Sequence, residues 1–144
     1  MRHPRLSELE SQVDEVRASP RDCGTLELIA RRPAPAEREV LEEGTLDGVE
    51  GLVGDRWLES TRGATGKGAD PDRQLTVMNS RAAALFAGPR ERWALCGDQL
   101  YVDLDLSPAN LPPGSRLAIG EAVVEVSPPP HTGCAAPARS SSLP

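Results

Sequence analysis

The sequence predicts a mainly β fold of the α+β class, a small barrel with a few short peripheral helices. The chain is rich in turn residues, with 14 prolines and 13 glycines, and its apolar runs are short and often alternate with polar residues. Its 144 residues suit one domain with one core. Because one Phe, one Tyr and two Trp supply all the aromatic area, the core depends on Leu, Val and Ala.

Residues 1–23 are expected to form an N-terminal helix and its lead-in to the domain. Before Pro20 ends the pattern, four apolar residues recur at helical spacing: Leu6, Leu9, Val13 and Val16. A helix with one apolar stripe packs that stripe and leaves its other face in water. We therefore expect this helix on the outside of the domain.

The domain itself is expected to span residues 24–134 and to begin with strands. Residues 25–30 form the first expected strand, and residues 38–46 form a second one that the polar segment 42–44 interrupts. Residues 74–78 are expected as a buried strand. The alanine-rich helix that follows is capped by Asn79 or Ser80 and ends near Gly88.

The clearest strand pattern lies between residues 101 and 106. Its apolar members, expected to face the core, alternate with members expected to face water: Val102, Leu104 and Leu106 against Tyr101, Asp103 and Asp105. Residues 116–119 and 122–126 then flank Gly120-Glu121, whose length and leading glycine predict a type II′ hairpin. The short strands together favour the barrel.

Charge and cysteine spacing exclude several classes of protein. Sixteen basic and 22 acidic residues give a net charge of -6, which argues against a nucleic-acid partner. We expect no membrane partner either, because no apolar run approaches the length that crosses a bilayer and no signal sequence is visible. The cysteines at 23, 96 and 134 are odd in number and form no CxxC pair, so a disulfide scaffold and structural zinc are both poor interpretations. A reducing cytoplasm is the expected location.

Cys134 is the first candidate for chemistry. It ends the segment Pro129-Pro130-His131-Thr132-Gly133-Cys134, a loop that follows the expected hairpin. A thiol reacts as the thiolate, which accessible loops near basic groups favour, and His131 lies three residues away to assist it. The alternative, from the spacing alone, is an ordinary loop cysteine beside a proline run.

Two arginines are candidates for binding an anion. Arg56 in Gly54-Asp55-Arg56 offers a bidentate fork for phosphate, and Asp55 can accept backbone or guanidinium hydrogen bonds. Arg73 stands at the entry of the buried strand, within reach of an anionic ligand. The alternatives are a surface turn with a local ion pair for the first motif and a solvated charge for Arg73.

Four segments together resemble the MOSC domain, the family named after the C-terminal part of molybdenum-cofactor sulfurase. They are Gly54-Asp55-Arg56, Arg73-Gln74-Leu75-Thr76, Gly97-Asp98-Gln99-Leu100 and the segment that ends at Cys134. The likeness covers about residues 24–134 and ends there. Family members continue with a further helix and closing strands, whereas residues 135–144 are of low complexity and are expected to be disordered or non-native. The resemblance therefore implies a MOSC-like barrel truncated after the cysteine motif.

The resemblance also implies a function and a set of site residues. Cys134 would carry sulfur as a persulfide or ligate molybdenum, with His131 assisting, and five residues would bind the pterin of the molybdenum cofactor: Asp55, Arg56, Arg73, Asp98 and Gln99. The implied activity is a cofactor-dependent oxidoreductase or a sulfur carrier, served by a separate redox partner or sulfur-donor protein. The alternative is a non-catalytic module for a small anion, or an inactive truncated remnant.

Pyridoxal phosphate is not an expected cofactor. The single lysine of the chain, Lys67, lies in a glycine-rich polar loop. A lysine that forms a Schiff base needs a desolvated and fixed position. We therefore expect no mechanism that depends on this cofactor.

Overall fold

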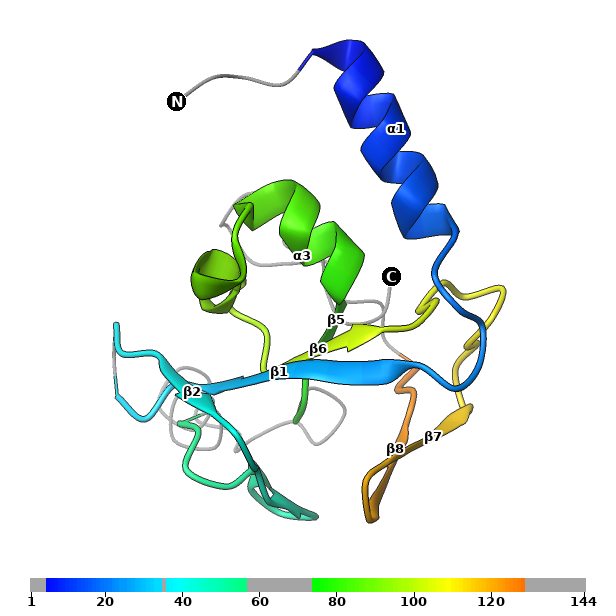
Figure 1. Cartoon of the computed structure of the whole chain (residues 1–144). Coiled ribbons are helices and arrows are strands. Elements are labelled where there is room, and N and C mark those ends of the chain that lie inside the picture. The colour runs from blue at the N-terminus through cyan, green and yellow to red at the C-terminus, as the bar shows by residue number, and fades with distance from the viewer. Residues whose placement is uncertain (1–4, 35, 57–73, 129–144) are drawn as a thin grey trace.

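A computed structural model describes residues 5–34, 36–56 and 74–128 and arranges them as helices around several small sheets (Figure 1). The central sheet has four strands in the order β2-β1-β6-β5. These are β1 (Thr25–Arg31), β2 (Glu39–Leu41), β5 (Val77–Asn79) and β6 (Leu100–Asp103). β1 pairs antiparallel with β2 and with β6, while β5 pairs parallel with β6.

Within the described residues, two hairpins and three helical segments accompany the central sheet. The hairpins are β3 (Leu46–Asp47) with β4 (Gly51–Leu52), and β7 (Arg116–Ile119) with β8 (Ala122–Glu125). The helical segments are α1 (Leu6–Arg17), α3 (Ser80–Ala87) and the 3₁₀ helix η2 (Arg90–Cys96). The mixture of helices and short strands is confirmed. Within the described ranges the strands form three separate sheets and no closed barrel, so the barrel stays a prediction.

The central sheet is covered on both faces, and its apolar residues form two clusters. One cluster lies beneath α3 and η2 and consists of Leu28, Ala30, Met78, Ala83, Trp93, Ala94 and Tyr101. The other lies on the opposite face, where the small hairpins pack, and consists of Ile29, Leu52, Val77, Leu100, Val102, Leu104 and Leu106. Successive strand residues supply opposite clusters, as the two-residue period of a strand requires.

Tyr101 shows where the sequence interpretation was wrong. The alternation places it on the water-facing side of its strand, yet Tyr101 is 0% exposed. Its hydroxyl donates to the carbonyl of Trp93 at 2.8 Å, and the two rings lie with centroids 6.1 Å apart. The 3₁₀ helix η2, which the sequence analysis did not predict, covers that face. The alternation of apolar and polar residues that is typical of a half-exposed strand therefore occurs here in a strand that is covered on both faces at Tyr101.

Several local elements agree with the sequence. Helix α3 begins where expected, because Asn79 Oδ1 accepts a hydrogen bond from Ala82 N at 2.9 Å. The β7–β8 turn has φ +59° at Gly120 and no positive φ at Glu121, the signs of a type II′ turn. The expected strand over 38–46 is instead two short strands, β2 and β3, which the polar residues between them separate.

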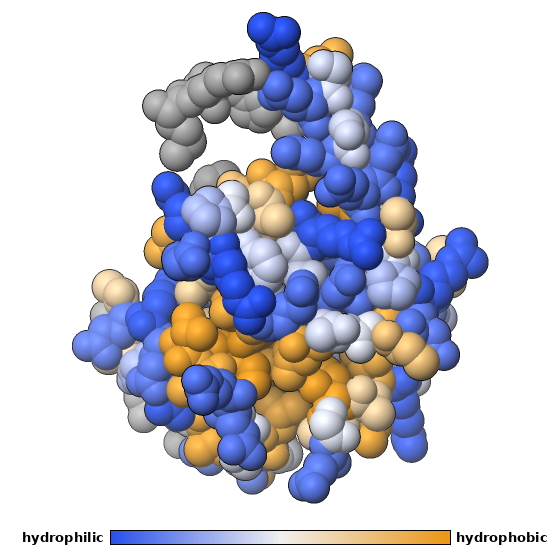
Figure 2. All heavy atoms as spheres, in the orientation of Figure 1, coloured by the Kyte–Doolittle hydropathy of each residue, from blue (hydrophilic) through white to orange (hydrophobic). Residues whose placement is uncertain are grey.

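Figure 2 shows where the covering of the sheet is incomplete on the side in view. Below β1, between β2 and the β7–β8 hairpin, apolar atoms reach the surface. Leu41, Leu46, Leu117 and Ile119 are only partly buried against the second cluster. Within the described ranges, none of the helices has both the length and the apolar character to cross a membrane.

Candidate functional site

The turn at Gly54 brings the first motif to the end of β1. Gly54 has φ +90°, and a Cβ atom there would lie 2.9 Å from Cζ of Arg31, closer than real Cβ contacts allow. The Arg31 guanidinium packs over this turn and donates to the carbonyl of Val53 at 3.2 Å. The backbone N–H of Arg56 then donates to the carbonyl of Arg32 at 2.9 Å. Glycine at position 54 therefore allows the motif to lie against β1.

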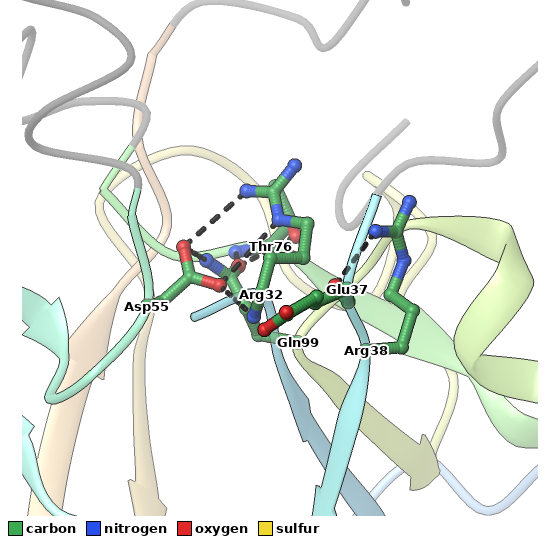
Figure 3. Close-up of polar contacts among 6 residues, drawn as sticks. All are labelled: Arg32, Glu37, Arg38, Asp55, Thr76 and Gln99. Atoms are coloured by element: carbon green, nitrogen blue, oxygen red, sulfur yellow. Dashed lines mark hydrogen bonds and ion pairs between the residues drawn. The ribbon is translucent and has the colours of Figure 1, made fainter. Parts of the chain in front are cut away.

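Asp55 forms the centre of the polar contacts in Figure 3. Its Oδ1 accepts from the backbone N–H of Arg32 at 2.7 Å and from Arg32 Nε at 3.4 Å, and its Oδ2 lies 3.3 Å from Arg32 Nη2. Gln99 Nε2 donates to Asp55 Oδ2 at 3.2 Å. The Asp55 side chain is 0% exposed, whereas that of Arg32 is 34% exposed. A buried carboxylate thus holds an arginine that still reaches water.

Gln99 joins this pair to the sheet. Its Oε1 accepts from both the backbone N–H and the hydroxyl of Thr76, each at 2.7 Å. Its own backbone carbonyl accepts from Ala30 N at 2.7 Å. We call Arg32, Asp55, Thr76 and Gln99 the Asp55 network. It ties the end of β1, the turn after β4 and the entries of β5 and β6 into one unit, and it satisfies a side chain that is 2% exposed.

Two further arginines, Arg38 and Arg56, lie beside the Asp55 network. Arg31 and Glu39 are partners in the β1–β2 register and form an ion pair at 2.6 Å. The next residues on each side, Arg32 and Arg38, fall on the opposite face of the hairpin. Figure 3 shows both guanidinium groups rising on the same side of the sheet end. Arg56 follows Asp55 directly, so three cationic residues come from three segments of an acidic chain.

Asp98 and Gln99 are adjacent in sequence but act on different faces of the sheet. Gln99 serves the Asp55 network, whereas the charge of Asp98 acts on Cys96 and Tyr101 on the helix-covered side. Burial, followed by the Asp98 charge, raises the pKa of the Cys96 thiol. The same two causes, in that order, raise the pKa of Tyr101 well above its ordinary value. Both groups therefore stay neutral at physiological pH, and Cys96 is a poor nucleophile.

The remaining residues expected at the site are not covered by the described ranges. Arg73, His131 and Cys134 fall outside them, as does Lys67. Within residues 5–34, 36–56 and 74–128, no group of three His, Cys, Asp or Glu side chains is placed to hold a metal ion. Of the residues expected at the site, the described part of the chain brings together Asp55, Arg56 and Gln99. They come from two motifs that the sequence analysis treated separately.

Arg32 and Thr76 belong to the same site but were missed as candidates. The sequence holds one signal for Arg32: the pair Arg31-Arg32 stands directly between an apolar strand and Pro33, where two charges are placed at a strand end. Thr76 lay inside a motif used only for the resemblance. No family model, curated protein or solved structure matches this chain. The site therefore has to be interpreted from its own geometry.

Proposed function

We propose that this chain binds a small phosphate-bearing ligand at the arginine-rich edge formed by Arg32, Arg38 and Arg56. Following the MOSC resemblance, the ligand is the pterin molybdenum cofactor, and Cys134, assisted by His131, is the sulfur or metal ligand. A MOSC-like barrel that includes the central sheet belongs to the same proposal. Arg73, at the entry of the strand region 74–78, would add a fourth cation.

The observation that carries the proposal is the way Asp55 holds Arg32. Nε and Nη2 of Arg32 are directed at the buried carboxylate, so Nη1 lies on the side of the guanidinium away from Asp55 (Figure 3). A guanidinium fixed on one edge presents its remaining donors without losing much further side-chain freedom when a ligand binds. Phosphate oxygens are the acceptors that suit such donors.

Within the Asp55 network, the carboxylate of Asp55 and the side-chain amide of Gln99 already make hydrogen bonds to protein groups. Asp55 accepts from Arg32 and Gln99, and Gln99 accepts from Thr76. Asp55 and Gln99 therefore act through the arginine that they position, and the resemblance assigned them a more direct contact. This donor set fits the phosphate end of the cofactor. When bound, the cofactor would supply molybdenum redox chemistry or accept sulfur, with electrons or sulfur delivered by a separate protein.

A non-catalytic anion-binding module is the second candidate. It is favoured by the same arginine-rich edge, which needs no cysteine to bind an anion. The two candidates differ in what Cys134 contributes. For the cofactor proposal Cys134 is essential to loading, and for the module it is not.

Cofactor loading separates these candidates. We would purify the protein from a host that makes the molybdenum cofactor and measure molybdenum and oxidised pterin per chain. Arg32→Gln and Cys134→Ser are both expected to lose most of the molybdenum. Arg116→Gln is the matched control, because Arg116 is 78% exposed and makes only a long contact with Glu125 at 3.8 Å. Wild-type protein without molybdenum, or full loading of Cys134→Ser, would contradict the cofactor proposal.

A further inference from the structure

Helix α1 is held to the rest of the molecule at its C-terminal end. Arg81 Nη1 donates to the carbonyl of Glu15 at 2.9 Å, and Asn79 Nδ2 donates to Ser19 Oγ at 2.9 Å. The hydroxyl of Ser19 in turn donates to the carbonyl of Val16 at 2.6 Å. From this attachment the helix rises away from α3, and Figure 2 shows it as a largely hydrophilic projection. Its N-terminal half diverges from α3 in Figure 1.

The apolar stripe of α1 is only partly used within one molecule. Val13 and Val16 are half-buried, whereas Leu6, seven residues before Val13, is 72% exposed. A 12-residue helix is marginal in water by itself, so an apolar residue left exposed at its free end contributes little to stability. Spacings of seven and three residues are those of a coiled-coil seam. The stripe therefore has the form of a seam for a second helix.

The charges beside this stripe favour one particular partner, which is another copy of α1 in the opposite direction. With Leu6 and Val13 at the first position of the heptad, Glu10 and Arg17 both occupy its fifth position. In an antiparallel pair these positions of the two helices face each other, so Glu10 of one copy meets Arg17 of the other, twice by symmetry. Arg17 is 77% exposed and makes only a 3.7 Å contact with Asp14, so it is available for such a pair.

We propose that α1 is a dimerisation helix that packs antiparallel against α1 of a second copy of this chain. In this arrangement the projecting half of each helix, with Leu6, lies beside the anchored half of the other, with Val13 and Val16. The exposed leucine is then buried in both copies. This proposal is independent of the ligand at the arginine-rich edge.

Sedimentation equilibrium of the full chain tests the proposal through two charge reversals. Glu10→Arg and Arg17→Glu, each alone, place like charges opposite each other twice, and each is expected to weaken the dimer roughly tenfold. An equimolar mixture of the two variants restores both opposite-charge pairs and is expected to form a heterodimer of wild-type affinity. Leu6→Glu is expected to weaken the dimer by about a hundredfold or more, because a buried leucine is lost on both sides.

Three outcomes would overturn the proposal. The first is a wild-type protein that stays monomeric at high micromolar concentration. The second is weakening by Glu10→Arg but not by Arg17→Glu, which is the pattern of a parallel pair in which Arg5 meets Glu10. The third is a mixture of the variants that fails to associate although each variant keeps its wild-type circular dichroism spectrum.

Discussion

The replacement Asp55→Asn removes the charge at the centre of the Asp55 network and changes the side-chain volume little. Asparagine keeps an oxygen for the backbone N–H of Arg32, but it loses the ionic contacts to the Arg32 guanidinium. Its amide NH₂ also opposes Gln99 Nε2, which donates to the present carboxylate at 3.2 Å. Arg32 Nη2 and Gln99 Nε2 both donate to Oδ2, so two favourable contacts are lost and each becomes a donor–donor contact.

The size of the effect follows from burial. Hydrogen bonds to charged groups contribute about 1.5–3 kcal/mol each, and the loss is largest when the partner stays dehydrated. Because Arg32 is 34% exposed, its guanidinium can regain water when the contact is lost. The total loss of stability is therefore smaller than the sum of the two hydrogen-bond contributions. We expect the free energy of unfolding to fall by about 2–3 kcal/mol. At roughly 3–4 °C per kcal/mol for a chain of this length, Tm should fall by about 6–12 °C.

The chain offers a closely matched control in the Arg81–Asp103 pair. That pair has the same bidentate contacts, at 2.7 and 3.3 Å, and its arginine is also 34% exposed. Asp103 is 27% exposed, however, whereas Asp55 is fully buried. Asp103→Asn should therefore cost only about 1 kcal/mol. Urea unfolding of both variants would measure the difference, provided that the m value is unchanged. Equal losses would refute the argument that burial of Asp55 makes this network strong.

Three further outcomes follow from the geometry. Gly54→Ala should cost about 2–3 kcal/mol, because the new Cβ displaces the Arg31 guanidinium from its contacts, whereas Gly97→Ala, in the left-handed region with φ +91° but no atom within 4 Å of its Cβ, should cost only about 1 kcal/mol; equal urea midpoints would contradict this. Because burial raises the pKa of the Cys96 thiol, iodoacetamide labelling followed by mass spectrometry should be slow at pH 7 and rise in alkali, and fast labelling at pH 7 would count against it. Hydrogen bonds from Ser107 lower the pKa of Asp105, so the stability that they contribute is full above the unfolded value of about 3.9 and lost as pH falls through the folded value. Ser107→Ala removes the hydroxyl contact, so it should lower the urea midpoint at pH 7, and its difference from wild type should shrink as pH falls through the folded pKa of Asp105; a difference that stays constant would contradict this.

The elements that could be predicted from sequence are those set by local chemistry. Helix α3 follows from its Asn79 cap and its alanines, and the β7–β8 hairpin follows from Gly120 and the two alternating strands. The position of Tyr101 could not be predicted in this way, because a 3₁₀ helix that carries Trp93 covers it. That helix has no 3.6-residue apolar period, so its contact with the sheet is decided by tertiary packing.

The candidate site was predictable in part for the same reason. Asp55 and Gln99 were singled out by their motifs, but the hydrogen bond between them joins residues 44 positions apart. Arg32 lies 23 positions from Asp55, and their contact depends on β1 reaching the turn at Gly54. No local pattern reports that approach. The resemblance placed Asp98 beside Gln99 in one role, whereas Gln99 contacts Asp55 and the charge of Asp98 acts on Cys96 and Tyr101.

Calorimetric titration with inorganic pyrophosphate tests the central claim most directly, since it needs neither the cofactor nor Cys134. Wild-type protein and Arg116→Gln are expected to bind pyrophosphate with the same affinity, which falls as salt is added. Arg32→Gln is expected to bind it about tenfold more weakly, because one charge-assisted contact is worth about 1.4 kcal/mol. Absence of binding to wild-type protein, or equal weakening by Arg116→Gln, would contradict an anion site at this edge.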